Sequence, residues 1–394
     1  MNPFYKTTNI LIILASLVAC TKSSNSKDKN ILVAGLLFLQ SRTTTTGIGG
    51  PTATRVYGQG GSFTTATSNK GGISTDSLYS PEGIAIDSSG GIYIGDTNNN
   101  RVLYYPAGST TATKVYGQNG SFTANTPPTG SGITASSLSG PTNILLDSNG
   151  GVYISNGQRV LYFTSGSTTA SRVYGQAGSF TINISNQSGT DANSLYNPSG
   201  LALDSSNGLY IADSGNNRVL YYPSGTTTAT RVYGQLGSFT NSLVDSRNVT
   251  ADSLNNPRGL LLDKNNGLYI ADSSNNRVLY FTSGSIVPSK VYGQSDYTSS
   301  SAKTTSASSL GSPYGLVMDS SGGLYISNSN RVTYFPSGNT VANKVYGQGG
   351  NFTTSTSNNG GISANSLNGT AGLALDASER LYIVDTTNNR VLYY

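Results

Sequence analysis

The chain has 394 residues but no histidine and a single cysteine. Without histidine there is no imidazole to act as a general base, and no nucleophile of the Cys–His type. One cysteine excludes a disulfide within the chain and, with histidine absent, a structural zinc site. Three common kinds of functional site are therefore missing from this sequence.

Charged residues are also scarce, at 10% of the chain against about 25% in ordinary globular domains. Glycine, serine, threonine and asparagine take their place, a composition common outside the cytoplasm. The formal net charge of +5 comes from basic residues that recur once or twice in each sequence repeat, not from one basic patch or stripe. We therefore expect no nucleic-acid partner.

The N-terminus predicts export and lipidation. Residues 1–19 contain a ten-residue apolar run, Ile10 to Ala19, which is too short to span a bilayer and is typical of a signal peptide. The run ends in Leu17-Val18-Ala19-Cys20, which resembles the lipobox of bacterial lipoproteins, and the only cysteine stands where that motif needs it. The alternative is an ordinary secretory signal followed by a chance cysteine. We predict a lipid on Cys20 and an extracytoplasmic, membrane-anchored protein.

Residues 20–54 are then a lipidated tether and linker, because residues 21–30 and 41–54 are polar and rich in small side chains. Residues 31–39 (ILVAGLLFL) are apolar but too few to cross a bilayer. This stretch can lie at the membrane surface or pack on the domain; we favour the second.

From residue 55 onward the chain repeats one unit. The motif VYGQ or its position begins at residues 56, 115, 173, 232, 291 and 345, and a period in this range predicts a propeller or solenoid. In the third unit four short segments have strand composition: Gly200–Asp204, Gly208–Asp213, Arg218–Tyr222 and Thr230–Gly234. Asp-Ser-Ser-Asn-Gly at 204–208 is a hairpin turn.

Six units of four antiparallel strands predict an all-β, six-bladed β-propeller over residues 55–394. A solenoid would need polar caps, which the sequence does not show. The last unit lacks its VYGQ strand, and Arg55–Gln59 supplies one at the other end, so we expect that strand to close the last blade. The linkers after VYGQ each contain one aromatic and one leucine, which we interpret as two side chains that pack each linker onto the ring.

The motif P-x-G-(I/L)-A-(I/L)-D followed by G-(I/L)-Y-I-A-D-S-x-N-N-R-V-L resembles the NHL repeat family over residues 55–394. The resemblance implies a propeller but does not define a function, since some relatives are lyases or lactone hydrolases and others bind RNA or proteins. The zinc lyases use histidine ligands that this chain lacks. Calcium-dependent lactonase-like propellers use a ring of Glu, Asn and Asp in the channel, to which only Glu82 and Asn143 could belong.

Two sets of aspartates recur around the predicted ring, one at strand ends and one beside the repeated arginines. Catalytic or metal-binding groups are seldom repeated six times, so we interpret them as turn formers and arginine partners. Blades two and five lose the second aspartate and one loop residue together, at Ser155–Arg159 and Ser327–Arg331. This paired loss indicates that the aspartate has a local role. The two sets are Asp87, Asp147, Asp204, Asp263, Asp319 and Asp376, and Asp96, Asp213, Asp272 and Asp385.

Candidate ligand residues come from the variable position x of P-x-G, because the inner strand should begin there, at the channel mouth. The residue at x differs from repeat to repeat while the residues around it stay nearly the same, and such variation often maps to a binding face. The alternative is that x is simply exposed and varies without a function. Glu82 and Arg258 should face each other across the ring and grip a polar or zwitterionic ligand, with Tyr314 offering a stacking surface. The predicted rim is Glu82, Arg258 and Tyr314, which stand at position x, and Asn143, which replaces the glycine of P-x-G in blade two.

The sequence thus predicts a monomeric lipoprotein of the cell envelope whose propeller binds a protein, peptide or glycan, without a cofactor, metal or catalytic residue of its own. One alternative is a lyase or hydrolase with a divalent metal in the channel. The other is a purely structural envelope protein. Converging carboxylates at the channel mouth would favour the enzyme, and a broad polar or aromatic face would favour the binding protein.

Overall fold

The computed structural model describes residues 50–187, 189–242 and 249–394. The predictions for the signal peptide, Cys20 and the apolar stretch 31–39 lie outside these residues. Within them, no helix is long and apolar enough to cross a membrane.

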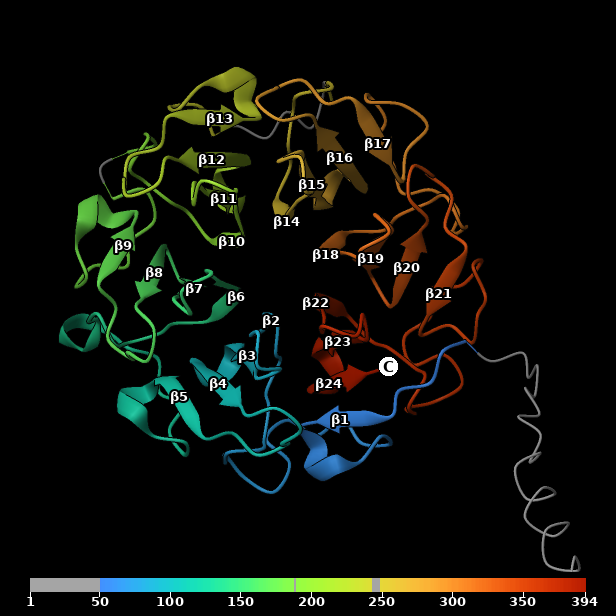
Figure 1. Ribbon diagram of the computed structural model, residues 1–394, viewed down its shortest axis with the longest axis horizontal. Helices are drawn as coiled ribbons and strands as arrows, with labels where there is room; N and C mark the ends of the chain where they lie inside the picture. The colour runs from blue at the N-terminus through green and yellow to red at the C-terminus, as the bar shows by residue number, and fades with distance from the viewer. Residues whose placement is uncertain (1–49, 188, 243–248) are drawn as a thin grey trace, which may run out of the picture. The chain divides into compact units, whose positions relative to one another are not determined.

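The described chain forms six four-stranded antiparallel sheets arranged as blades around a centre (Figure 1). The predicted six-bladed propeller is confirmed. Blades one to three are β2 (Ile84–Ile86), β3 (Ile92–Asp96), β4 (Arg101–Tyr105) and β5 (Lys114–Gly117); β6 (Pro141–Leu146), β7 (Val152–Asn156), β8 (Arg159–Phe163) and β9 (Arg172–Tyr174); and β10 (Pro198–Leu203), β11 (Leu209–Asp213), β12 (Arg218–Tyr222) and β13 (Arg231–Tyr233).

Blades four to six continue the same order from the inner to the outer strand. They are β14 (Pro257–Leu262), β15 (Leu268–Asp272), β16 (Arg277–Phe281) and β17 (Lys290–Tyr292); β18 (Pro313–Met318), β19 (Leu324–Asn328), β20 (Arg331–Phe335) and β21 (Lys344–Tyr346); and β22 (Thr370–Leu375), β23 (Leu381–Asp385), β24 (Arg390–Tyr393) and β1 (Arg55–Tyr57).

Short 3-10 turns complete the described secondary structure. One group follows outer strands, and another forms the loop between the second and third strands. They are η1 (Gln59–Gly61), η2 (Thr97–Asn99), η3 (Gln118–Gly120), η4 (Gly130–Gly132), η5 (Gln176–Gly178), η6 (Ser214–Asn216), η7 (Gln235–Gly237), η8 (Ser273–Asn275) and η9 (Thr386–Asn388).

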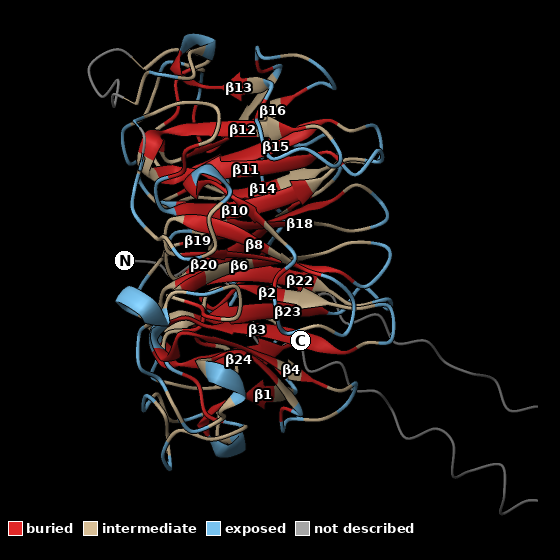
Figure 2. Ribbon diagram, turned by 90° about the vertical axis from the view of Figure 1, so that its left-hand side faces the viewer, coloured by how far each residue is buried: buried red, intermediate tan, exposed pale blue. Residues whose placement is uncertain are grey.

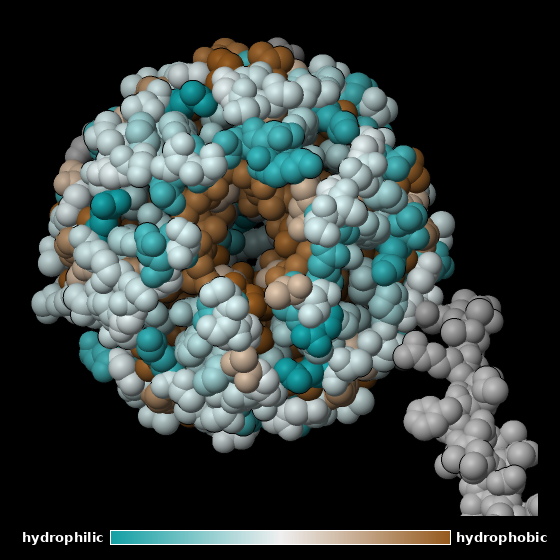
Figure 3. Space-filling model, in the orientation of Figure 1, coloured by the Kyte–Doolittle hydropathy of each residue, from teal (hydrophilic) through white to brown (hydrophobic). Residues whose placement is uncertain are grey.

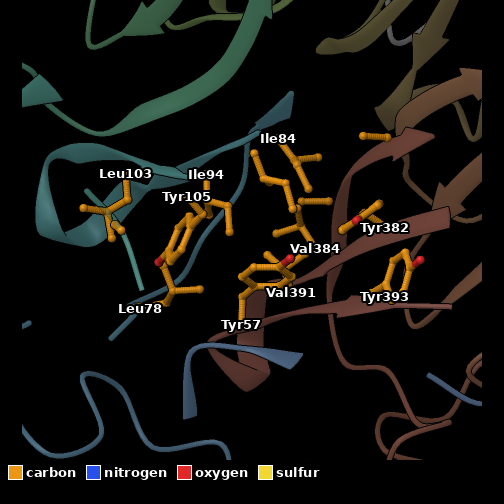
Figure 4. Close-up of a cluster of buried hydrophobic side chains, with 14 of the residues drawn as sticks. Tyr57, Leu78, Ile84, Ile94, Leu103, Tyr105, Tyr382, Val384, Val391 and Tyr393 are labelled. Atoms are coloured by element: carbon orange, nitrogen blue, oxygen red, sulfur yellow. The ribbon is translucent and has the colours of Figure 1, made fainter. Parts of the chain in front are cut away.

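The ring closes as the sequence predicts, by pairing β1 with the last strand of the chain. Val56 pairs with Leu392 and Tyr57 with Val391 in antiparallel register. Figure 4 shows Tyr57 between the side chains of blades one and six, and its ring centroid is 5.4 Å from that of Tyr105. The N-terminal strand thus joins both ends of the described chain into one core.

Each interface between blades is filled by its own apolar cluster, which explains why the strands are apolar on both faces. Figure 2 shows the strands buried and the loops at both ends exposed. The linker residues also pack as predicted. The leucines are at most 2% exposed: Leu78, Leu138, Leu195, Leu254, Leu310 and Leu367. The aromatics pack partly buried against the clusters: Phe63, Phe122, Phe180, Phe239, Tyr297 and Phe352.

A buried arginine in each blade holds two linkers in place. In blade three, Arg218 Nε donates to Asp213 Oδ2 at 2.7 Å, and its terminal nitrogens donate to backbone carbonyls of the linkers before and after the blade, at Ser194 and Phe239. Asp213 Oδ1 also accepts from the backbone N–H of Tyr196 at 2.7 Å. The local role predicted for this aspartate is confirmed. In blades two and five an asparagine, Asn156 or Asn328, takes its place.

The aspartates at the ends of the inner strands form turns, also as predicted. Asp204 Oδ1 accepts from the backbone N–H groups of Ser206 and Gly208 at 2.8 and 2.7 Å. The same carboxylate-capped hairpin recurs in the other blades, for example at Asp87 and Asp263. These carboxylates therefore stabilise turns on the side of the ring opposite the linkers.

Candidate functional site at the channel mouth

The inner strands β2, β6, β10, β14, β18 and β22 surround the centre of the ring (Figure 1), and the space-filling view shows a hollow there, which we call the channel (Figure 3). In the space-filling view apolar side chains gather around the central hollow (Figure 3). Neighbouring inner strands approach closely at the glycine of P-x-G. A Cβ on Gly200 would collide with the carbonyl oxygen of Arg258, and one on Gly259 with that of Tyr314. The glycines thus fix the backbone of the next blade's x residue at the channel wall.

The x residues lie at the end of the channel that the linkers cover. The linker before blade three and the loop after β11 share one face, because the Gly215 N–H donates to the Tyr196 carbonyl at 2.8 Å. Since β10 begins directly after this linker, Ser199 lies at that face. The same geometry applies to each repeat.

Three of the predicted rim residues meet across the channel. Tyr314 Oη donates to Glu82 Oε2 at 2.5 Å. The guanidinium carbon of Arg258 lies 5.4 Å from the centroid of the Tyr314 ring. These residues come from blades five, one and four, and blade six separates blade five from blade one, so the Tyr314–Glu82 hydrogen bond has to span the channel. We call Glu82, Arg258 and Tyr314 the channel trio.

The trio differs from the expected arrangement in one respect. Glu82 and Arg258 were expected to face each other across a space that a ligand would fill. Instead Tyr314 occupies part of that space, bonded to Glu82 by its hydroxyl and facing Arg258 with its ring. A ligand that reaches both charges must therefore move the tyrosine or bind on its channel side.

Burial dominates the electrostatics of the trio. Desolvation raises the pKa of the Glu82 carboxyl, although the hydrogen bond from Tyr314 and the positive charge of Arg258 act in the opposite direction. Burial and the neighbouring Glu82 also raise the pKa of Tyr314 well above its ordinary value. Tyr314 therefore keeps its hydroxyl proton at neutral pH and acts as a hydrogen-bond donor. The mouth presents a carboxyl, a guanidinium and an aromatic ring within one constriction.

Asn143 and the remaining x residues are not part of the trio. Asn143 replaces the glycine in β6, where a Cβ on the neighbouring Gly83 would lie 3.0 Å from the Asn143 Cα. Thr142 and Ser199 donate from their hydroxyls to the carbonyls of the next inner strand, at Pro198 and Pro257. Ala371 is buried. Their role as ligand contacts stays a prediction.

Among residues 50–394, apart from 188 and 243–248, no three His, Cys, Asp or Glu side chains lie close enough together to hold an ion. A calcium site would require several oxygen ligands with carboxylate charge, whereas Glu82 is the only carboxylate in the trio. We therefore derive no metal-dependent step for this channel.

Comparison with known proteins supports the same class of fold. The family model of the NHL repeat matches residues 78–105, 195–222 and 254–281. The chain thus carries NHL repeats in a six-bladed β-propeller, and both findings support its assignment to the NHL-repeat propellers. No curated protein matches the chain.

Solved structures resemble the propeller at low sequence identity. A protein of unknown function from Bacteroides thetaiotaomicron is 14% identical with a TM-score of 0.57, over 86% of this chain and 75% of that one. A gluconolactonase from Xanthomonas campestris is 13% identical with a TM-score of 0.51, over 87% and 98%. A virginiamycin B lyase from Staphylococcus aureus is 14% identical with a TM-score of 0.45, over 82% and 86%. At these identities the similarity concerns the fold alone.

Proposed function

We propose that this protein is a lipid-anchored extracytoplasmic binding protein of the bacterial cell envelope, whose propeller takes a protein, peptide or glycan ligand at the linker-side mouth of its channel. The observation that carries the proposal is the channel trio. A framework repeated six times places a carboxyl, a guanidinium and a tyrosine at equivalent positions, where they meet only because the ring is closed.

The trio suits recognition of a polar ligand. Glu82 accepts hydrogen bonds, Arg258 donates them and attracts anions, and Tyr314 offers a ring that already attracts one cation. A zwitterionic group, such as a chain terminus or an amino sugar beside a carboxylate, would complement both charges. Binding would exchange the Tyr314–Glu82 hydrogen bond for contacts with the ligand.

The test is a full-length triple variant, Glu82→Ala, Arg258→Ala and Tyr314→Ala, compared with the wild type in capture from envelope and host-surface extracts. The proposal expects the partner retained by the wild type to be lost by the variant while its far-UV circular dichroism is unchanged. Unchanged affinity in a folded variant would place the site elsewhere, on the linkers or the outer strands.

The anchoring part of the proposal rests on the sequence around Cys20. Mass spectrometry of the mature N-terminus should find cleavage before Cys20 and two or three acyl chains, since a single chain anchors only marginally. Cys20→Ser should release or mislocalise a propeller of unchanged melting temperature. Cleavage elsewhere or an unmodified cysteine contradicts the anchor without affecting the binding proposal.

A second candidate is an enzyme that works in the channel. One observation favours it: Glu82 has a pKa raised by burial and stands beside a tyrosine hydroxyl and a cation, as general acids often do. Elemental analysis separates the two, because stoichiometric calcium or another divalent metal in the purified protein would favour a lyase or hydrolase.

A further inference from the structure

Two cavities of about 550 Å³ each lie between neighbouring blades, one between blades one and two and the other between blades four and five. They are lined by the hairpin turns of the inner strands, so they open on the face opposite the channel trio. This volume falls within the range of small-ligand sites, about 300–1,000 Å³.

The two cavities are built from the same positions of the repeat. Three shared positions form the main wall: Tyr93, Tyr104 and Lys114 in the first, and Tyr269, Tyr280 and Lys290 in the second. Because the blades concerned are three apart in a ring of six, the cavities are related by half a turn around the channel.

Two sequence features coincide at these interfaces. The outer strand of the first blade carries a lysine, Lys114 or Lys290, where three other blades carry an arginine. The hairpin of the second blade carries a glycine, Gly150 or Gly322, at its left-handed position, with φ of 79° and 83°. Both changes shorten side chains that would otherwise point into the gap.

Longer side chains enter two of the corresponding gaps elsewhere. Between blades three and four, Asn266 Oδ1 accepts from the Ser205 N–H at 3.2 Å, and Asn266 Nδ2 donates to the Ser205 hydroxyl at 2.9 Å. Between blades five and six, Glu379 accepts from the Ser320 N–H at 2.7 Å.

The walls combine an aromatic surface with many hydrogen-bonding groups. In the first cavity the centroids of the Tyr93 and Tyr104 rings are 4.8 Å apart, and the Lys114 ammonium lies 5.9 Å from the centroid of the Tyr104 ring. In the second, Tyr280 Oη donates to Asp263 Oδ2 at 2.9 Å, which fixes both groups in the wall. The lining also includes serine hydroxyls, from both hairpins in the first cavity and from the blade-five hairpin in the second, and an aspartate of each blade. A carboxylate has about four acceptor positions, so each aspartate can accept further hydrogen bonds.

We propose that the two cavities are equivalent carbohydrate-binding sites. A sugar ring has an apolar C–H face that packs on tyrosine and a rim of hydroxyls that pair with carboxylates, hydroxyls and an ammonium group. Two copies of one site on the same face fit a ligand that presents the same unit repeatedly, as a polysaccharide or a glycan-coated surface does. Simultaneous occupation of both would raise apparent affinity by about 10²–10⁴-fold over one site.

The variants that test this use residues that the chain itself carries in other blades. Lys114→Arg with Gly150→Asn should fill the first cavity, and Lys290→Arg with Gly322→Asn the second. A Cβ at Gly150 or Gly322 would meet only a flexible serine hydroxyl at 2.9 Å, and asparagine already adopts positive φ at Asn207 and Asn266. Gly90→Asn is the matched control, because the same change lies in the gap between blades six and one.

The full-length protein and its variants are applied to an array of immobilised neutral, acidic and amino-sugar oligosaccharides, and the strongest binder is titrated by calorimetry. We expect two sites per chain in the wild type, one after either cavity is filled, and none after both are filled. Apparent affinity for the surface should fall by at least about 10²-fold with one cavity filled. The Gly90→Asn control should match the wild type.

Three results would overturn the proposal: no glycan bound by the wild type, a stoichiometry other than two, or retained binding by a folded variant with both cavities filled. Since the stoichiometry is measured on the wild type, the test does not depend on the variants folding. The channel-trio triple variant should bind the glycan normally, which separates this inference from the proposed function.

Discussion

Blade two contains a buried arginine without the carboxylate that its counterparts in blades one, three, four and six have, and this missing partner predicts a stabilising substitution. Arg159 is 1% exposed, and among the described residues neither its Nε nor Asn156 Nδ2 has a hydrogen-bond partner. Burial lowers the pKa of the Arg159 guanidinium to about 10. In blade three the equivalent Nε donates to a carboxylate oxygen at 2.7 Å. Asn156→Asp should restore that bond.

The size of the effect follows from the cost of a buried guanidinium whose terminal nitrogens are bonded but whose Nε has no partner among the described residues. A hydrogen bond to a charged group contributes about 1.5–3 kcal/mol, and the guanidinium is already buried, so only the new carboxylate has to lose water. We expect Asn156→Asp to raise the free energy of unfolding by about 2 kcal/mol. The reverse change in blade three, Asp213→Asn, removes one partner of a buried pair and should cost about 3–5 kcal/mol.

Differential scanning calorimetry and urea unfolding of both variants measure the two shifts, with opposite signs expected. Asn328→Asp in blade five is a weaker case, because Arg331 Nε already donates to the Asn328 side-chain oxygen at 3.1 Å. If Asn156→Asp is neutral or destabilising while Asp213→Asn costs less than about 1 kcal/mol, the buried pair is not what holds the linkers, and the reasoning fails.

Three further predictions concern packing, closure and pH. The Tyr222 hydroxyl is buried and has no partner within the described part of the chain, and blades two, four and five carry phenylalanine at this position. Tyr222→Phe should therefore stabilise by about 1 kcal/mol, whereas Tyr280→Phe should not, because it loses the bond to Asp263. A chain starting at residue 61 loses β1, including Tyr57, which is 0% exposed, and leaves the outer edge of β24 without a partner strand. It should melt far below the full chain or aggregate, and an unchanged melting temperature would contradict the closure. Burial raises the pKa of the Glu82 carboxyl in the folded protein. The stability that protonated Glu82 contributes is therefore complete below the pKa of about 4.3 that glutamate has in the unfolded chain, and it is lost as the pH rises through the pKa of Glu82 in the folded protein. The stability of the wild type relative to Glu82→Gln, measured by urea unfolding, should therefore decrease as pH increases from about 4, and a pH-independent difference would contradict this assignment.

The sequence was sufficient for the parts of the fold that each repeat specifies locally. The strands, the Asp204 turn and the Asp213–Arg218 pair all involve residues within a few positions of one another or one repeat apart, so their spacing is visible in the chain. The closure by Val56 was also predictable, because a missing strand at one end matched an extra strand at the other.

The functional surfaces were less predictable, because they depend on residues distant in sequence. The variable position identified Glu82, Arg258 and Tyr314, but not that the tyrosine bridges the other two, which depends on the channel width and side-chain directions. The paired cavities coincide with a lysine on one blade and a glycine on the next. Each is unremarkable in its own repeat, and only the blade interface shows their combined effect.

We propose that the propeller is a binding module that uses the channel trio, and one measurement tests this most directly. The full-length wild type and the Glu82→Ala, Arg258→Ala, Tyr314→Ala variant are each titrated with the partner captured from envelope or host-surface extracts. We predict that the variant, with an unchanged circular dichroism spectrum, loses at least about 10-fold in affinity, equivalent to about 1.4 kcal/mol. An affinity equal to that of the wild type would contradict the claim.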